Sequence, residues 1–251
     1  MLEILILSII QGITEFLPIS SSSHLILISE LLNFKSQGLS IDVSLHIGSF
    51  LAIIFYFKND LFNFIKNKDL FIKIFTASIP TLIIGYVLIR FNLIDQLRSL
   101  RVIGWTTISF GLLLYFADKF KNKKKIKDFN YNSALFIGLF QVLSLMPGVS
   151  RSGISITAAR FLNFKRVDSA KISFLLSVPT LSAISFYGLY SLVNEKSLEF
   201  SFLNLLTIFL SFIFSLITIT FFIKYIKKFS LKIFVIYRIL FGILLLSLAY
   251  L

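Results

Sequence analysis

The chain of 251 residues contains no cysteine, which excludes disulfides, thiolate chemistry and zinc–thiolate sites. Acidic residues are also scarce, with 12 Asp and Glu against 25 Lys and Arg. An acid inside an apolar segment is therefore a candidate for function. Residues 1–16 carry Glu3 and Glu15 but no basic start and no small-residue cleavage site, so we expect no cleavable signal peptide.

Apolar residues are abundant: 57% of the chain is hydrophobic, 30 residues are phenylalanine and the mean hydropathy is +0.89. Soluble domains are closer to about 45–50% apolar. Runs of about 20 apolar residues can cross the ~30 Å hydrocarbon core of a bilayer. We therefore predict an all-α, polytopic membrane protein, with full spans at about 41–57, 70–91, 100–116, 167–190, 202–223 and 231–251.

Two polar runs interrupt shorter apolar pieces: residues 11–24 (QGITEFLPISSSSH) and residues 141–153 (QVLSLMPGVSRSG). The pieces around them, about 1–16 with 21–33 and 131–146 with 151–162, are too short to cross a membrane. Such pairs predict two re-entrant helical hairpins. Irregular backbone at membrane depth is tolerated only where protein or water surrounds it, so the two tips are predicted to form one buried polar site. Aligned proline on proline, Ser21 matches Ser150.

The chain is expected to form a single membrane domain, 1–251, whose halves, about 1–117 and 131–251, are joined by a basic linker, 118–130. Each half has one hairpin and three spans. An odd number of crossings turns the second half upside down, which predicts an inverted-topology repeat of six transmembrane helices plus two re-entrant hairpins.

The net charge of +13 fits a membrane orientation rather than binding to nucleic acid. Fourteen basic residues lie on one predicted side, in segments 58–69, 118–130, 163–166 and 224–230. Five lie on the other, in segments 34–40, 90–101 and 191–201. The positive-inside rule predicts cytoplasmic basic loops and a polar site that faces outside, with membrane lipids as partners.

The first run contains the residues with the clearest chemical potential. Glu15 lies in an apolar segment, where an unpaired carboxylate costs several kcal/mol. On a helix, Ser20 and Ser21 share one face with His24, because they precede it by four and three residues. The serine and histidine could act as nucleophile and base, or as two ligands of one phosphate.

The second run contributes Arg151, between Ser150 and Ser152 and close to Gly148 and Gly153. A guanidinium suits phosphate oxygens, and the N-terminus of the following helix adds N–H donors and a favourable dipole. Together with a carboxylate and a hydroxyl, this set fits phosphoryl chemistry on a lipid. An anion transporter would also use an arginine and helix N-termini.

These motifs resemble those of the bacterial undecaprenyl-diphosphate phosphatases, also called the bacitracin-resistance phosphatases. The resemblance covers essentially the whole chain and includes residues 12–24, 147–153, 173–179 and 237–238. It implies hydrolysis of undecaprenyl diphosphate to undecaprenyl phosphate and inorganic phosphate at the outer face of the bacterial plasma membrane. It also implies recycling of the carrier lipid for peptidoglycan and a requirement for a divalent cation, Mg²⁺ or Ca²⁺.

Matched by position, the resemblance and the residue chemistry together predict four catalytic residues: Glu15, Ser21, His24 and Arg151. They predict phosphate binding by Arg151, Ser20, Ser150, Ser152, Gly153 and Ser155. Whether Ser21 or His24 attacks is left open. Many members have a second glutamate where this chain has Gln11, so the candidate metal ligands are Glu15 and Gln11.

A flippase for the carrier lipid, or an anion transporter, is the competing interpretation. A nucleophile beside a carboxylate favours the enzyme, because transport needs no nucleophile. The type-2 phosphatidic acid phosphatases are excluded, because their Ser-Arg-x5-His motif requires histidine where this chain has Thr157, and no histidine follows His46. The sequence leaves open whether the chain forms a homodimer.

Overall fold

The computed structural model describes residues 1–32, 34, 38–66, 68–91, 93, 97–194 and 202–251. In these residues the chain is helical, and the β pairing is an isolated bridge between Lys124 and Phe164. The predicted all-α class is confirmed. The helices are α1 (Leu2–Thr14), α2 (Ser21–Leu32), α3 (Leu39–Tyr56), α4 (Lys58–Lys66), α5 (Lys68–Arg90), α6 (Leu100–Asp118), α7 (Tyr131–Val142), α8 (Arg151–Phe161), α9 (Arg166–Asn194), α10 (Phe202–Lys228) and α11 (Lys232–Tyr250).

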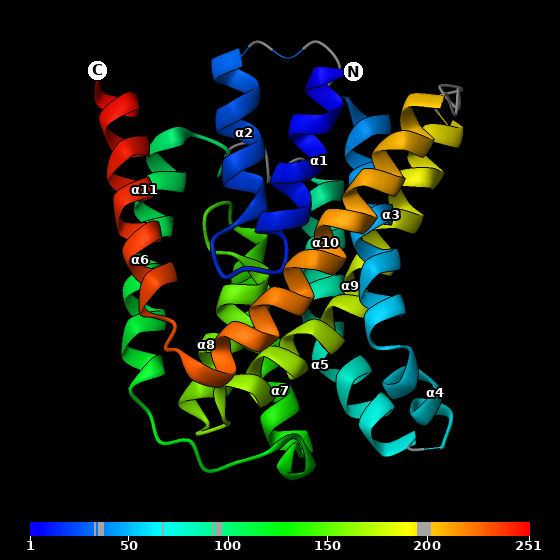
Figure 1. Cartoon of the computed structure of the whole chain (residues 1–251), viewed down its shortest axis with the longest axis vertical. Helices are drawn as coiled ribbons and strands as arrows, with labels where there is room; N and C mark the ends of the chain where they lie inside the picture. Colours follow the sequence, from blue (N-terminus) through cyan, green and yellow to red (C-terminus); the bar gives the residue numbers. More distant parts are fainter. Residues whose placement is uncertain (33, 35–37, 67, 92, 94–96, 195–201) are drawn as a thin grey trace.

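Six helices among the described residues are long and apolar enough to cross a membrane: α3, α5, α6, α9, α10 and α11. They are the six predicted spans, and together they form a bundle along the long axis (Figure 1). Helix α10 extends beyond its expected end, because Lys227 and Lys228 in its last turn suit the negative end of the helix dipole. The predicted loops 34–40, 90–101 and 191–201 lie partly outside the described residues.

Segment 58–69 was expected to be a basic loop, and this prediction is wrong for most of it, because helix α4 occupies Lys58–Lys66. Asp60 lies in the first turn, where a carboxylate interacts favourably with the helix dipole. Lys171 on α9 donates to Asp60 at 2.6 Å, which anchors α4 to the bundle. A high density of charge is compatible with a short helix at the edge of the bundle.

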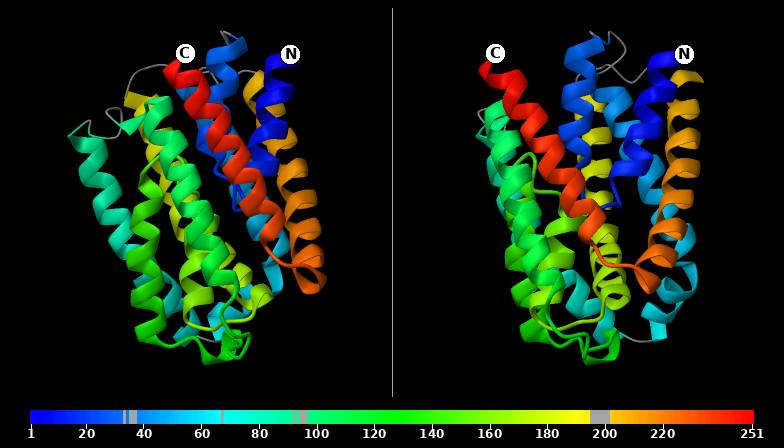
Figure 2. Two further views of the ribbon diagram at one scale, coloured as in Figure 1. Left: turned by 90° about the vertical axis from the view of Figure 1, so that its left-hand side faces the viewer. Right: turned by 60° about the vertical axis from the view of Figure 1, so that its left-hand side comes forward.

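The two predicted pairs of short helices are present as α1 with α2 and α7 with α8. Helices α1 and α2 descend from the end of the molecule that holds both termini and join at mid-height (Figure 1). Helix α7 approaches from the opposite end, so the turn before α8 reaches the same level (Figures 1 and 2). Hydrogen bonds between the two turns show that they meet: Ser152 Oγ donates to the Leu17 carbonyl at 2.8 Å.

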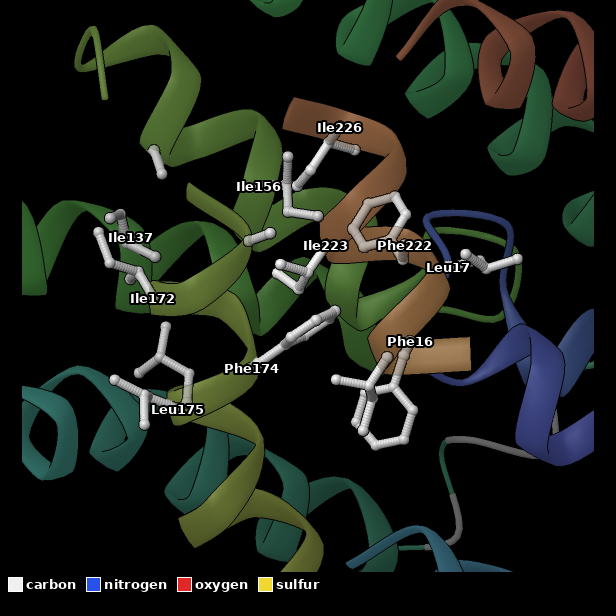
Figure 3. Close-up of a cluster of buried hydrophobic side chains, with 14 of the residues drawn as sticks. Phe16, Leu17, Ile137, Ile156, Ile172, Phe174, Leu175, Phe222, Ile223 and Ile226 are labelled. Carbon is white, nitrogen blue, oxygen red and sulfur yellow. The ribbon is translucent and has the colours of Figure 1, made fainter. Parts of the chain in front are cut away.

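The first turn is anchored in the main hydrophobic cluster (Figure 3). Phe16 is fully buried, and its ring packs edge-on against Phe174 of α9 at a centroid distance of 5.4 Å. Phe174 in turn contacts Phe222 of α10 at 5.9 Å. Since Phe16 directly follows Glu15, this aromatic packing fixes the position of the carboxylate.

Glycines allow several of the helices to approach closely. A Cβ atom on Gly188 would lie 2.3 Å from Val43, and one on Gly242 would lie 2.5 Å from Ile108. Helices α7 and α5 also cross closely, since a Cβ atom on Gly138 would lie 2.2 Å from the Ala77 carbonyl oxygen. Small residues at such crossings are typical of membrane bundles.

We predict that Gly138→Ala destabilises the protein by about 1–3 kcal/mol, because the added methyl group can be accommodated only if α5 and α7 move apart. Thermal unfolding in detergent measures the effect. Gly38→Ala is the matched control, since nothing lies within 4 Å of its Cβ position. Equal melting temperatures for the two variants would contradict the packing argument.

Candidate active site

An ion pair between Glu15 and Arg151 connects the two turns. Glu15 directly follows α1, and Arg151 is the first residue of α8. Arg151 Nη2 donates to Glu15 Oε1 at 2.7 Å, and both side chains are largely buried, at 13% and 6% exposure. Arg151 Nη1 also donates to Thr180 Oγ1 at 3.2 Å. The site is therefore built from both halves of the chain.

The other carboxylate oxygen of Glu15 accepts two further hydrogen bonds. Ser21 Oγ donates to Glu15 Oε2 at 2.7 Å, and Gln11 Nε2 donates to the same atom at 3.2 Å. Ser21 is the first residue of α2, and Gln11 lies one turn before Glu15 on α1. The carboxylate thus lies within direct reach of a hydroxyl proton.

The Gln11 amide also reaches the second histidine. Gln11 Nε2 lies 3.3 Å from His46 Nδ1, and because an amide nitrogen only donates, the histidine nitrogen accepts. Gln11 Oε1 is buried and has no hydrogen-bond partner among the described residues. A cavity of about 300 Å³ lies beside this group, and Gln11, Ser21, Ser22 and His46 contribute to its lining.

Both turns end in a serine with an unusual backbone conformation. Ser20 has a φ of 74° and Ser150 a φ of 71°, and each is followed directly by a helix. Such conformations in non-glycine residues typically cost about 1–3 kcal/mol and cluster at functional sites. The backbone therefore matches Ser20 with Ser150, and Ser21 with Arg151. The proline-based alignment of Ser21 with Ser150 is wrong by one residue.

The serines of the second turn mainly stabilise the turn itself through their hydrogen bonds. Ser150 Oγ accepts from the Gly153 N–H at 3.1 Å as the N-cap of α8, and it lies 3.2 Å from Ser152 Oγ. Ser155 lies one turn further along α8 and donates to Gln141 at 3.4 Å. In the first turn, Ser20 Oγ lies 2.9 Å from Ser23 Oγ.

His24 points away from the Glu15 carboxylate towards α11. Its Nδ1 donates to the Ser20 carbonyl at 2.6 Å, so its Nε2 accepts from the Tyr237 hydroxyl, 2.7 Å away, in the neutral ring. The ring also stacks on Phe241, with centroids 4.2 Å apart. His24 thus supports the start of α2, next to Ser21, with both ring nitrogens engaged.

Arg238 connects the two turns through hydrogen bonds to their carbonyl groups. It is fully buried on α11. Its guanidinium donates to the carbonyls of Gly148 at 2.9 Å, Val149 at 3.0 Å and Thr107 at 3.1 Å. A longer bond of 3.4 Å reaches Pro18 in the first turn. Thr106 adds a bond of 2.6 Å to the Pro147 carbonyl.

Sequence reasoning missed Thr106 and Thr180, which form bonds at the site from distant spans. Hydroxyl residues inside spans are common, and these two have no local signal that separates them from the others. Tyr237 did carry a recognisable signal in the sequence, because it belongs to the Tyr237–Arg238 pair that forms part of the family resemblance.

The fold and these contacts define an integral membrane protein with a buried, phosphate-suited centre made of an arginine, a carboxylate and a serine. The chain belongs to the family described as "Bacitracin resistance protein BacA", whose model matches residues 4–244. The predicted family is thereby confirmed.

The curated relatives include proteins named undecaprenyl-diphosphatase. One from Pelagibacter ubique is 50% identical over 99% of this chain and 98% of its own length. One from Saccharophagus degradans is 42% identical, covering 96% of this chain and 95% of the relative. One from Jannaschia sp. is 38% identical over 98% and 97%.

We predict that Arg238→Lys lowers the stability by about 3 kcal/mol, because an ammonium cannot reach carbonyls in both turns and leaves some of them unpaired. Thermal unfolding in detergent measures the loss. The control is Arg101→Lys, whose native side chain makes an exposed bond of 3.3 Å to the Ala249 carbonyl. A comparable loss in the control would show that Arg238 has no special role.

Proposed function

We propose that the chain hydrolyses undecaprenyl diphosphate to undecaprenyl phosphate and inorganic phosphate, and so recycles the carrier lipid for cell-wall synthesis. The observation that carries this proposal is the continuous set of contacts from Arg151 through Glu15 to the Ser21 hydroxyl. Relatives that match almost their whole length bear the name of this enzyme. A flippase or anion transporter is not favoured, because neither explains the serine paired with a buried carboxylate.

Ser21 is the nucleophile in this proposal. Its Oγ attacks the terminal phosphorus, its proton passes to Glu15 Oε2, and the bond from that phosphorus to the bridging oxygen breaks, which releases undecaprenyl phosphate. Water then attacks the phosphoserine, yielding inorganic phosphate and restoring the hydroxyl. The 2.7 Å bond between Ser21 and Glu15 supports this assignment over His24, whose two nitrogens are already engaged.

Arg151 binds the terminal phosphate and stabilises the charge that builds up on it during transfer. It lies at the N-terminus of α8, where backbone N–H groups and the helix dipole also favour an anion. In the absence of substrate its charge is balanced by Glu15. When the terminal phosphate replaces Glu15 as the partner of the Arg151 guanidinium, the Glu15 carboxylate becomes free to accept the Ser21 proton.

A divalent cation fits the oxygen donors on the cavity side of this site. Gln11 Oε1 is buried without a hydrogen-bond partner among the described residues, and Glu15 lies one turn away, so both supply the hard oxygen ligands that Mg²⁺ and Ca²⁺ prefer. The described residues contain no group of three or more His, Cys, Asp or Glu that could hold a metal alone. A bound cation would neutralise phosphate charge, with substrate oxygens and water completing its coordination.

In this proposal the orientation of the protein in the membrane is assigned from the distribution of its basic residues. The segments rich in lysine are cytoplasmic, and the cavity beside Ser21 opens to the outside of the bacterial plasma membrane. The pairs α1 with α2 and α7 with α8 are re-entrant hairpins, in halves of opposite orientation. Both hairpins bring polar turns to membrane depth only where protein surrounds them.

We predict that Ser21→Ala lowers phosphate release from undecaprenyl diphosphate by roughly a thousand-fold, because among the described residues Ser21 supplies the hydroxyl that donates to Glu15. Ser22→Ala is the matched control and should keep most of the activity, since the Ser22 hydroxyl lies 3.3 Å from the Ser20 hydroxyl and forms no bond to Glu15 among the described residues. Acid-quenched turnover should leave a phosphate on Ser21 that survives acid. An acid-labile phosphate on His24 would instead identify the histidine as the nucleophile.

We predict that chelation abolishes turnover, that Mg²⁺ restores it, and that Gln11→Glu lowers the Mg²⁺ concentration needed for half-maximal rate. The reason is that a second carboxylate beside Glu15 attracts the cation more strongly than an amide. Gln141→Glu is the control, because Gln141 is an equally buried glutamine that lies on α7 and bonds Ser155. An unchanged Mg²⁺ requirement in Gln11→Glu would exclude Gln11 and Glu15 as the cation site.

A further inference from the structure

A second polar cavity, of about 480 Å³, lies near the end of the molecule opposite the termini, between the end of α6 and the start of α11 (Figure 1). It is distinct from the cavity beside Ser21 and shares no lining residue with it. Its lining includes Tyr115, Lys119, Lys121, Arg166, Ser230 and Lys232.

The charge of this cavity is positive. Asp118, the acidic residue in its lining, forms ion pairs with two arginines. Its Oδ1 lies 2.7 Å from Arg166 Nε and 3.6 Å from Arg160 Nε. Over the part of the chain that the structure describes, Lys121 and Lys232 form no ion pair with a carboxylate. Lys119 lies over the Tyr115 ring at 4.2 Å. The cavity therefore offers ammonium groups that an anion would neutralise.

The wall of the cavity is held in place from inside the protein. Arg160 is fully buried. Its guanidinium donates to the carbonyls of Asp118, at 3.1 Å, and Phe120, and to Asn122 Oδ1, at 2.8 Å. Asp118 also accepts from the Leu231 N–H at 3.0 Å. These bonds fix the chain on both sides of the cavity before any ligand arrives, which favours binding.

An apolar surface continues from the cavity along the two helices. Ile236 and Leu240 follow Lys232 on α11 at intervals of four residues, so they lie along one face, and both are exposed. Leu112 and Phe116 form a similar exposed line on α6. In a membrane these side chains face acyl chains. The basic cavity thus lies where a lipid headgroup would meet the protein while its chains run beside α6 and α11.

We propose that this cavity binds the phosphate headgroup of an anionic glycerophospholipid. Phosphate accepts hydrogen bonds from Lys121, Lys232 and the Ser230 hydroxyl, and the acyl chains cover the apolar faces of α6 and α11. Basic pockets between membrane helices are suited to such head groups. By linking the residues after α6 to the start of α11, the lipid stabilises the bundle at this end.

The test compares two double variants of the whole protein in detergent. Lys121→Gln with Lys232→Gln removes the cavity's ammonium groups, whereas Lys224→Gln with Lys228→Gln removes the same charge from exposed positions at the end of α10. Added phosphatidylglycerol is expected to raise the melting temperature of the wild type and of the α10 variant. The cavity variant is expected to lose at least half of that increase and to retain one lipid fewer in native mass spectrometry.

Three results would overturn the proposal. Equal losses in both double variants would show that only overall charge matters. Equal stabilisation by zwitterionic phosphatidylcholine would show that the headgroup charge is not recognised. Equal stabilisation by glycerol 3-phosphate, which has the same phosphate but no acyl chains, would identify a site for a soluble anion. Both cavity lysines are exposed, so their variants are expected to melt like the wild type before lipid is added.

Discussion

The buried ion pair between Glu15 and Arg151 is the interaction on which the centre of the molecule depends. Removing two charges from water is expensive, and the attraction between them compensates only if their remaining hydrogen-bonding groups are satisfied. Ser21 and Gln11 donate further bonds to the carboxylate, and Thr180 accepts one from the guanidinium. Neither half of the chain can form this set alone, so the pair also fixes how the two turns meet.

The scaffold around the pair places irregular backbone inside a helical bundle. The Arg238 guanidinium donates to two carbonyls of the second turn, those of Gly148 and Val149. It also donates to the Pro18 carbonyl in the first turn and to the Thr107 carbonyl on α6. Phe16 holds the first turn from the other side by aromatic packing. The left-handed conformations of Ser20 and Ser150 are maintained by this double support. In these two turns the strained residues are those directly before α2 and α8.

The sequence predicted the spans and the short helices well because hydrophobic length and proline breaks are local signals. It predicted the proximity of Glu15, Ser21 and Arg151 because both polar runs interrupt apolar segments. It could not predict the direction of His24, which depends on the contact with Tyr237 more than 200 residues away. Nor could it predict that Arg160 is buried, since the carbonyls that bind it come from loop residues without a recognisable pattern.

The mutual neutralisation of Glu15 and Arg151 has a consequence for selectivity. In its resting form the pair presents no net charge, so a lipid with a single phosphate gains little by separating it. A diphosphate carries more negative charge and can compete for the guanidinium more strongly. The resting pair would therefore act as an electrostatic threshold that a diphosphate passes more readily than a single phosphate.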